Sequence, residues 1–82
     1  MGKNRVKFST VEQIKDFVDI VYPYDMDMDL VHNRYTIDAK SIMGIFSLDL
    51  SNPLELVLHT SDSLLTEELL QKLRKAGILY EE

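Results

Sequence analysis

The segment from Tyr24 to Leu30 alternates strictly between apolar and acidic side chains. Its acidic members are Asp25, Asp27 and Asp29. Because successive side chains of a β-strand point to opposite faces, we expect Met26, Met28 and Leu30 to face a core while the aspartates face water. A strand with one wet face belongs to a sheet that is covered on one side only, so the chain is predicted to fold in two layers.

Residue patterns elsewhere predict three further strands and three helices. The strands are expected at Arg5–Phe8, Tyr35–Ile37 and Leu54–Leu58, and the helices at Val11–Val21, in the segment Ser41–Leu48, and from Asp62 or Ser63 to a stop at Gly77. The order β-α-β-β-α-β-α predicts an α+β fold, a two-layer open-faced β-sandwich with a four-stranded antiparallel sheet. At 82 residues, the chain is predicted to form a single domain spanning residues 1–82.

Two local signals support this order. Ser9 precedes Glu12 by three residues, which is the capping-box spacing at the start of a helix. Asn33-Arg34 is expected to form a tight turn between two strands, because asparagine tolerates positive φ.

The charge and composition of the chain narrow the classes of partner. The net charge is −5, which speaks against nucleic acid, because phosphates require a basic face. The sequence has no cysteine, which excludes disulfides. No segment has the apolar length of a signal peptide or a membrane span. We therefore expect a soluble cytoplasmic protein without membrane contact, and no pattern of residues implies a cofactor.

The segment from Lys40 to Leu48 joins a hydroxyl to an apolar run. Ser41 has the side chain that an N-cap position prefers, since its oxygen accepts a hydrogen bond from an amide one turn later. Free amides and the positive end of a helix would also favour a phosphoryl group on that oxygen. On chemistry alone, a plain capping serine is the simpler interpretation.

The motif Lys40-Ser41-Ile42-Met43-Gly44 resembles the signature around the regulatory serine of HPr, the small phosphocarrier family of the bacterial sugar phosphotransferase system. HPr proteins have the element order predicted above, so the resemblance implies an HPr-like fold. In Gram-positive HPr proteins the matching serine is phosphorylated by an ATP-dependent kinase, which implies regulatory phosphorylation at Ser41. The resemblance covers the second half of the chain well and the first helix only by pattern.

The short helix after Ser41 is too apolar to bury all of its side chains. Ile42, Met43 and Phe46 cannot all point inward if Ile45 and Leu48 do, because the helix has only about two turns. An exposed apolar patch on a small soluble protein indicates a binding surface. The resemblance implies that phosphotransferase enzymes or a transcriptional repressor dock there. Core packing under the long loop is the alternative, with equal weight for Phe46.

The start of the first helix departs from the HPr pattern. HPr proteins carry their phosphoryl group on a histidine in a Gly-Leu-His-Ala-Arg-Pro motif, whose arginine neutralises the phosphate. An anchor on Val6 and Phe17 places Thr10 near the position of that histidine and Glu12 near that of the arginine. A threonine hydroxyl has no neighbouring base to activate it, and a glutamate would repel a phosphoryl group. The sequence therefore predicts that histidine phosphotransfer is lost, as in the catabolite-repression paralogue of HPr.

No metal site is predicted. Neighbouring aspartates of the alternating segment lie about 7 Å apart on one strand face, which is too far for one calcium ion to be ligated by all three. A solvated strand face is the better interpretation. His32 and His59 are most simply solvent-exposed residues at strand ends.

Two hypotheses follow. The first is an HPr-family regulatory or adaptor protein, not an enzyme, whose partners are phosphotransferase-system enzymes, an HPr kinase or a transcriptional regulator. The second is an active phosphocarrier with a non-standard acceptor such as Thr10 or His59. The chain is expected to be a monomer or a weak homodimer.

Overall fold

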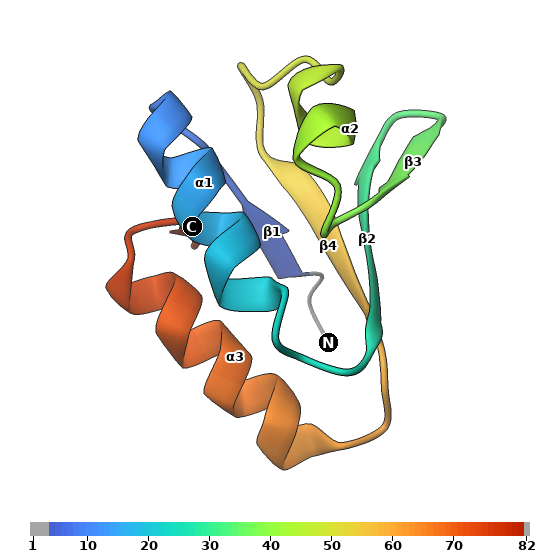
Figure 1. Cartoon of the computed structure of the whole chain (residues 1–82), viewed down its shortest axis with the longest axis vertical. Coiled ribbons are helices and arrows are strands. Elements are labelled where there is room, and N and C mark those ends of the chain that lie inside the picture. The colour runs from blue at the N-terminus through green and yellow to red at the C-terminus, as the bar shows by residue number, and fades with distance from the viewer. Residues whose placement is uncertain (1–3, 82) are drawn as a thin grey trace.

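A computed structural model describes residues 4–81 of the chain (Figure 1). Within these residues there are three helices and five strands. In chain order they are β1 (Asn4–Val6), α1 (Val11–Val21), β2 (Asp27–His32), β3 (Tyr35–Asp38), α2 (Ile42–Phe46), β4 (Leu54–His59), α3 (Ser63–Lys75) and β5 (Leu79–Tyr80). The predicted α+β class and the order of the first seven elements are therefore confirmed.

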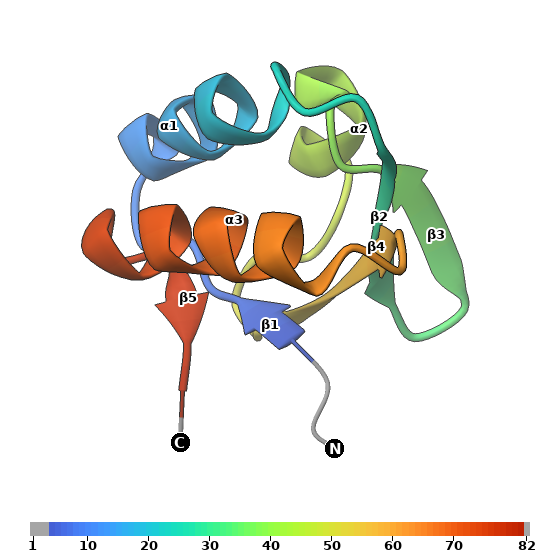
Figure 2. The same ribbon diagram turned by 90° about the horizontal axis from the view of Figure 1, so that it is seen from below.

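The strands form one antiparallel sheet in the order β3-β2-β4-β1-β5. Figure 2 shows the three helices on the same side of this sheet, which leaves its other face uncovered. Strand β4 pairs with strands that are distant in sequence on both of its sides. Its Leu56 lies opposite Leu30 of β2 and opposite Asn4 of β1.

The prediction of four strands is wrong by one. The fifth strand, β5, pairs with β1 and places Leu79 opposite Val6. The backbone N–H of Lys7 also donates to the Ile78 carbonyl oxygen at 2.9 Å. A two-residue strand is too short to show any periodicity, so only its pairing with the N-terminal strand identifies it.

The predicted burial of alternate residues from Tyr24 onward is confirmed, although strand β2 begins only at Asp27. The alternate residues Tyr24, Met26, Met28 and Leu30 are all buried. Tyr24 and Met26 lie in bends before the first ladder pair, so their burial comes from packing on the core and not from strand pairing. The following turn contains Asn33 at a φ of 57°, which is the left-handed conformation expected of it.

The capping box predicted for α1 is shifted by one residue. Thr10, not Ser9, is the N-cap, and its Oγ1 accepts from the Gln13 N–H at 3.1 Å. The Gln13 side chain reaches back as in a capping box, but its Oε1 accepts from the N–H of Ser9, the residue before the N-cap, at 2.6 Å. Glutamine fills this role as well as glutamate, which leaves Glu12 free to point outward.

Helix α3 ends as the sequence predicts. Gly77 has a φ of 74° and follows the C-cap residue Ala76. The Ile78 N–H donates to the Leu73 carbonyl and the Gly77 N–H donates to the Arg74 carbonyl, which together form a Schellman motif. This motif turns the chain toward β5 and buries Ile78 completely.

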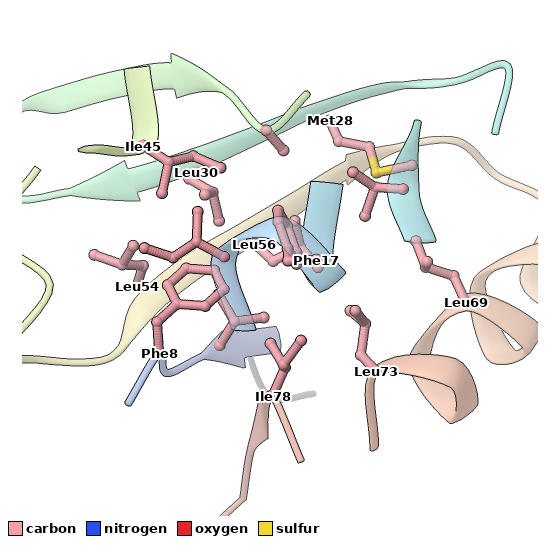
Figure 3. Close-up of a cluster of buried hydrophobic side chains, with 14 of the residues drawn as sticks. Phe8, Phe17, Met28, Leu30, Ile45, Leu54, Leu56, Leu69, Leu73 and Ile78 are labelled. Atoms are coloured by element: carbon pink, nitrogen blue, oxygen red, sulfur yellow. The ribbon is translucent and has the colours of Figure 1, made fainter. Parts of the chain in front are cut away.

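The core lies between the sheet and the helices (Figure 3). Phe17 of α1 is fully buried and meets Phe8 edge-on, with 5.3 Å between ring centroids. Helix α3 contributes Leu69 and Leu73, and α2 contributes Ile45. Among the described residues no buried side chain is polar or charged, so the interior is held by apolar packing. None of the helices in residues 4–81 has the length and hydropathy needed to cross a membrane.

Candidate functional site

Ser41 stands at the N-cap of α2. Its Oγ accepts from the Gly44 N–H at 3.1 Å, and its carbonyl oxygen accepts from the Ile45 N–H at 3.0 Å. A side chain at Gly44 would place its Cβ 3.1 Å from the Ser41 Oγ, so a glycine here leaves room for the capping bond. The serine itself is exposed to solvent. The hydroxyl is therefore engaged in the fold and still accessible from outside.

Ile45 decides which side chains of α2 reach the surface. It is fully buried in the core, and its burial turns the opposite side of the short helix outward. Met43 is 75% exposed and Phe46 is 43% exposed, whereas Ile42 is partly buried and packs against the core. The three predicted contact residues are thus not equivalent: Met43 and Phe46 face solvent, and Ile42 only partly does.

A shallow apolar pocket joins the end of α2 to the start of α1. It is lined by Phe8, Ser9, Thr10, Val11, Ile14, Phe46 and Leu50. Phe46, a predicted contact residue, and Thr10, near the predicted position of the HPr histidine, therefore line the same pocket. Val11 also lines the pocket and is 57% exposed, although it is not among the site residues predicted from the sequence. Its spacing from Ile14, Phe17 and Val21 already places it away from the middle of the buried side of α1.

The polar side chains of Thr10 and Gln13 at the start of α1 make hydrogen bonds that cap the helix. The Thr10 hydroxyl accepts the Gln13 amide bond described above, and no histidine precedes His32 in the sequence. Glu12 is exposed on the first turn of the helix and lines none of the pocket. A carboxylate favours the positive end of a helix, so Glu12 has a structural role as well as a charge.

His59 lies on the uncovered face of the sheet. Its Nε2 is 2.8 Å from the Asp29 Oδ2, and Asp27 and Asp38 line the same depression. The contact depends on the register of β2 and β4, in which Asp27 lies opposite His59, so the sequence pattern could not show it. His32, at the other end of β2, makes a long 3.4 Å contact with the Asn33 side chain and lies in one depression with Asp49. In residues 4–81 no three His, Asp or Glu side chains are arranged to hold a metal ion.

A polar cluster fastens α3 to the segment before β2. The Tyr24 hydroxyl donates to the Glu68 Oε2 at 2.6 Å, and the Lys72 Nζ lies 5.0 Å from the centre of the Tyr24 ring. Burial and the bond to Glu68 raise the pKa of Tyr24 above its usual value, and the same bond lowers the pKa of Glu68. The Tyr24 carbonyl accepts from the Lys40 Nζ, which ties the residue before Ser41 to this cluster.

A scan against protein-family models found no match to the chain, and a search of curated proteins found none either. A search of solved structures found the crystal structure of a phosphocarrier protein HPr from Bacillus anthracis str. Ames. That protein is 27% identical in sequence, and the match has a TM-score of 0.67 over 92% of this chain and 94% of that chain. The fold is HPr-like.

The pocket and Ser41 lie on the same side of this HPr-like fold. Both lie on the side of the molecule that α1 and α2 cover, whereas the His59–Asp29 pair lies on the uncovered sheet face. Val11, Met43 and Phe46 expose apolar side chains on the side that carries the capping hydroxyl of Ser41, and an exposed apolar patch of this kind can bind another protein. At the start of α1, the Thr10 hydroxyl is engaged in capping the helix.

Proposed function

We propose that this protein is a regulatory or adaptor member of the HPr family that acts in the phosphotransferase system by binding proteins. The HPr-like fold supports the family, and the exposed Met43 and Phe46 support a docking surface. Its partners would be phosphotransferase-system enzymes, an HPr kinase or a transcriptional regulator in the cytoplasm. The protein would act as a monomer or a weak homodimer.

We infer further that phosphotransfer through histidine is lost. The observation that carries this inference is the start of α1, where the Thr10 hydroxyl caps the helix and Glu12 is the adjacent charged group. The HPr resemblance implies a histidine and an arginine at this place. A capping hydroxyl without a base is a weak nucleophile, and a carboxylate repels an incoming phosphoryl group.

Phosphorylation of Ser41 is the proposed switch of the docking surface. Ser41 is exposed and stands two residues before Met43, so a phosphate there would add negative charge at the edge of the apolar surface. It would also meet the first amides of α2, one of which already binds the hydroxyl.

Two incubations followed by mass spectrometry of the intact protein test the proposal. With enzyme I and phosphoenolpyruvate, we expect no phosphorylation. With an HPr kinase and ATP, we expect one phosphoryl group on the wild type and none on Ser41→Ala, while Ser47→Ala serves as the matched control and is modified normally. A phosphoryl group transferred from enzyme I would overturn the loss of phosphotransfer, and an unmodified wild type would overturn the switch.

An active phosphocarrier with a non-standard acceptor is the second candidate, and the His59–Asp29 contact favours it. A carboxylate that binds one ring nitrogen orients the imidazole and leaves the other nitrogen available. However, Asp27 and Asp38 line the same depression, so a phosphoryl donor would approach three carboxylates. Enzyme I would phosphorylate the wild type but not His59→Gln if this candidate were correct, and Thr10→Val tests the other acceptor in the same way.

A further inference from the structure

The exposed side of α1 carries a strip of negative charge next to the apolar docking surface. The apolar band consists of Val11 on α1 with Met43 and Phe46 on α2, and Val11 and Phe46 line one pocket. The acidic strip consists of Glu12, Asp16 and Asp19, which follow one another at helical spacing and are all exposed. Helix α2 has no charged residue, so the charges of the α1/α2 pair come from α1 alone.

The stability of α1 accounts for only one member of this strip: Glu12 lies in the first turn, where the helix dipole favours an acid, whereas Asp16 and Asp19 gain nothing of this kind. Glu12 and Asp16 are four residues apart, so their like charges repel along the helix face. Asp19 lies in the last turn, where the helix dipole disfavours an acid, and that turn has no basic residue. Among residues 4–81 none of the three forms an ion pair within 4.0 Å. Lys15, the one base of α1, lies on the same helix face: it stands three residues after Glu12, the favourable order, and four residues before Asp19, the less favourable order.

Helix α3 shows the opposite arrangement in the same molecule. Its last turn carries Lys72, Arg74 and Lys75, and Lys72 pairs with Glu68 one turn earlier at 3.6 Å. The charges of α3 therefore stabilise their own helix, whereas those of α1 are directed to solvent without a partner in the described chain. Charges that a fold does not use for itself are available to a binding partner.

We propose that the α1/α2 side binds a protein surface that presents apolar side chains together with lysines or arginines. The apolar band would contribute the buried centre of this interface and the acidic strip its charged rim. Nucleic acid and anionic lipid do not fit, because the strip would repel their phosphates. This inference rests on the docking surface proposed above and adds the charge of the partner to it.

A pair of synthetic helical peptides tests the sign of the charge. One peptide combines leucine with lysine, and the other has glutamate in place of every lysine. Titration into the full-length ¹⁵N-labelled protein should shift the amide signals of Val11, Lys15, Met43 and Phe46 with the lysine peptide, with much weaker shifts for the glutamate peptide. Equal binding of both peptides, or lysine-peptide shifts confined to α3 or the uncovered sheet face, would overturn the proposal.

Matched variants separate the acidic strip from the overall negative charge. The triple variant Glu12→Gln, Asp16→Asn, Asp19→Asn should weaken binding of the lysine peptide roughly tenfold, as expected for the loss of three exposed charge contacts. The control Asp25→Asn, Asp27→Asn, Glu67→Gln removes the same charge elsewhere and should leave affinity within about twofold of the wild type. Equal weakening by both triples would show attraction by net charge alone and would overturn the proposal.

A third variant distinguishes failure of the charge inference from failure of the docking surface. Met43→Ala with Phe46→Ala removes the α2 part of the apolar band and keeps every charge. If this variant loses binding of the lysine peptide while the acidic triple variant keeps it, the docking surface is supported and the preference for a basic partner is wrong. If neither variant affects binding of the lysine peptide, both proposals fall.

Discussion

At the scale of single residues, the hydroxyl of Ser41 closes the first turn of α2 through its bond to the Gly44 amide. Ser41→Ala leaves that amide without its partner, so we expect the free energy of unfolding to fall by about 1 kcal/mol. Urea denaturation followed by circular dichroism measures this change. Ser63→Ala is the control, because Ser63 is an exposed first residue of α3 whose cap is Asp62, and no loss is expected there. An unchanged midpoint for Ser41→Ala would contradict a capping role.

Tyr24 uses its hydroxyl to hold α3. Tyr24→Phe keeps the buried ring and removes the bond to Glu68, so the free energy of unfolding should fall by about 1 kcal/mol. The neighbouring Tyr22 is 69% exposed, and Tyr22→Phe should leave the unfolding midpoint unchanged. If both variants behave alike, the hydroxyl of Tyr24 contributes nothing specific.

The raised pKa of Tyr24 also gives stability a dependence on alkaline pH. Burial keeps the phenol neutral in the folded chain, so its contribution is fully present below the usual tyrosine pKa and is lost as pH rises through the higher folded value. Urea midpoints should therefore decline in the wild type as pH rises above the usual tyrosine pKa of about 10, and they should decline less in Tyr24→Phe. Equal declines in the two proteins would exclude Tyr24 as the cause.

At the scale of elements, β5 is held by the residue that leads into it. Ile78 is fully buried, its carbonyl binds the Lys7 amide, and its own amide completes the Schellman motif of α3. Ile78→Ala should lower the free energy of unfolding by about 3 kcal/mol, because it leaves a cavity in the core. Leu64→Ala is the matched control on an 84% exposed leucine and should have little effect. A loss of less than about 1 kcal/mol for Ile78→Ala would show that this end of the sheet packs loosely.

At the scale of the whole molecule, one apolar core receives side chains from the sheet and all three helices. We therefore predict a single cooperative unfolding transition, as expected for one domain. Far-ultraviolet circular dichroism reports the helices, and near-ultraviolet circular dichroism of the tyrosines reports packing; the two should give coincident urea midpoints. Separate midpoints would contradict the single-domain prediction for residues 1–82.

Local chemistry made several features predictable from sequence. Alternation showed which of the residues from Tyr24 to Leu30 are buried, and Gly77 marked the end of α3, because both signals depend on neighbouring residues only. The capping residue of α1 was misplaced, since Ser9 and Thr10 both suit an N-cap and only backbone geometry chooses between them. The strand β5 was missed because two residues carry no period.

The sequence by itself determined the fold class, the capping serine at Ser41 and an excess of apolar side chains in α2, since residue type and spacing carry that information. Only the tertiary structure decided how these features combine. Burial of Ile45 turned Met43 and Phe46 outward, packing of α1 beside α2 placed Phe46 and Thr10 in one pocket, and sheet register paired His59 with Asp29. Each of these contacts joins segments that sequence spacing cannot relate, because their distance is set by the packing of the whole chain.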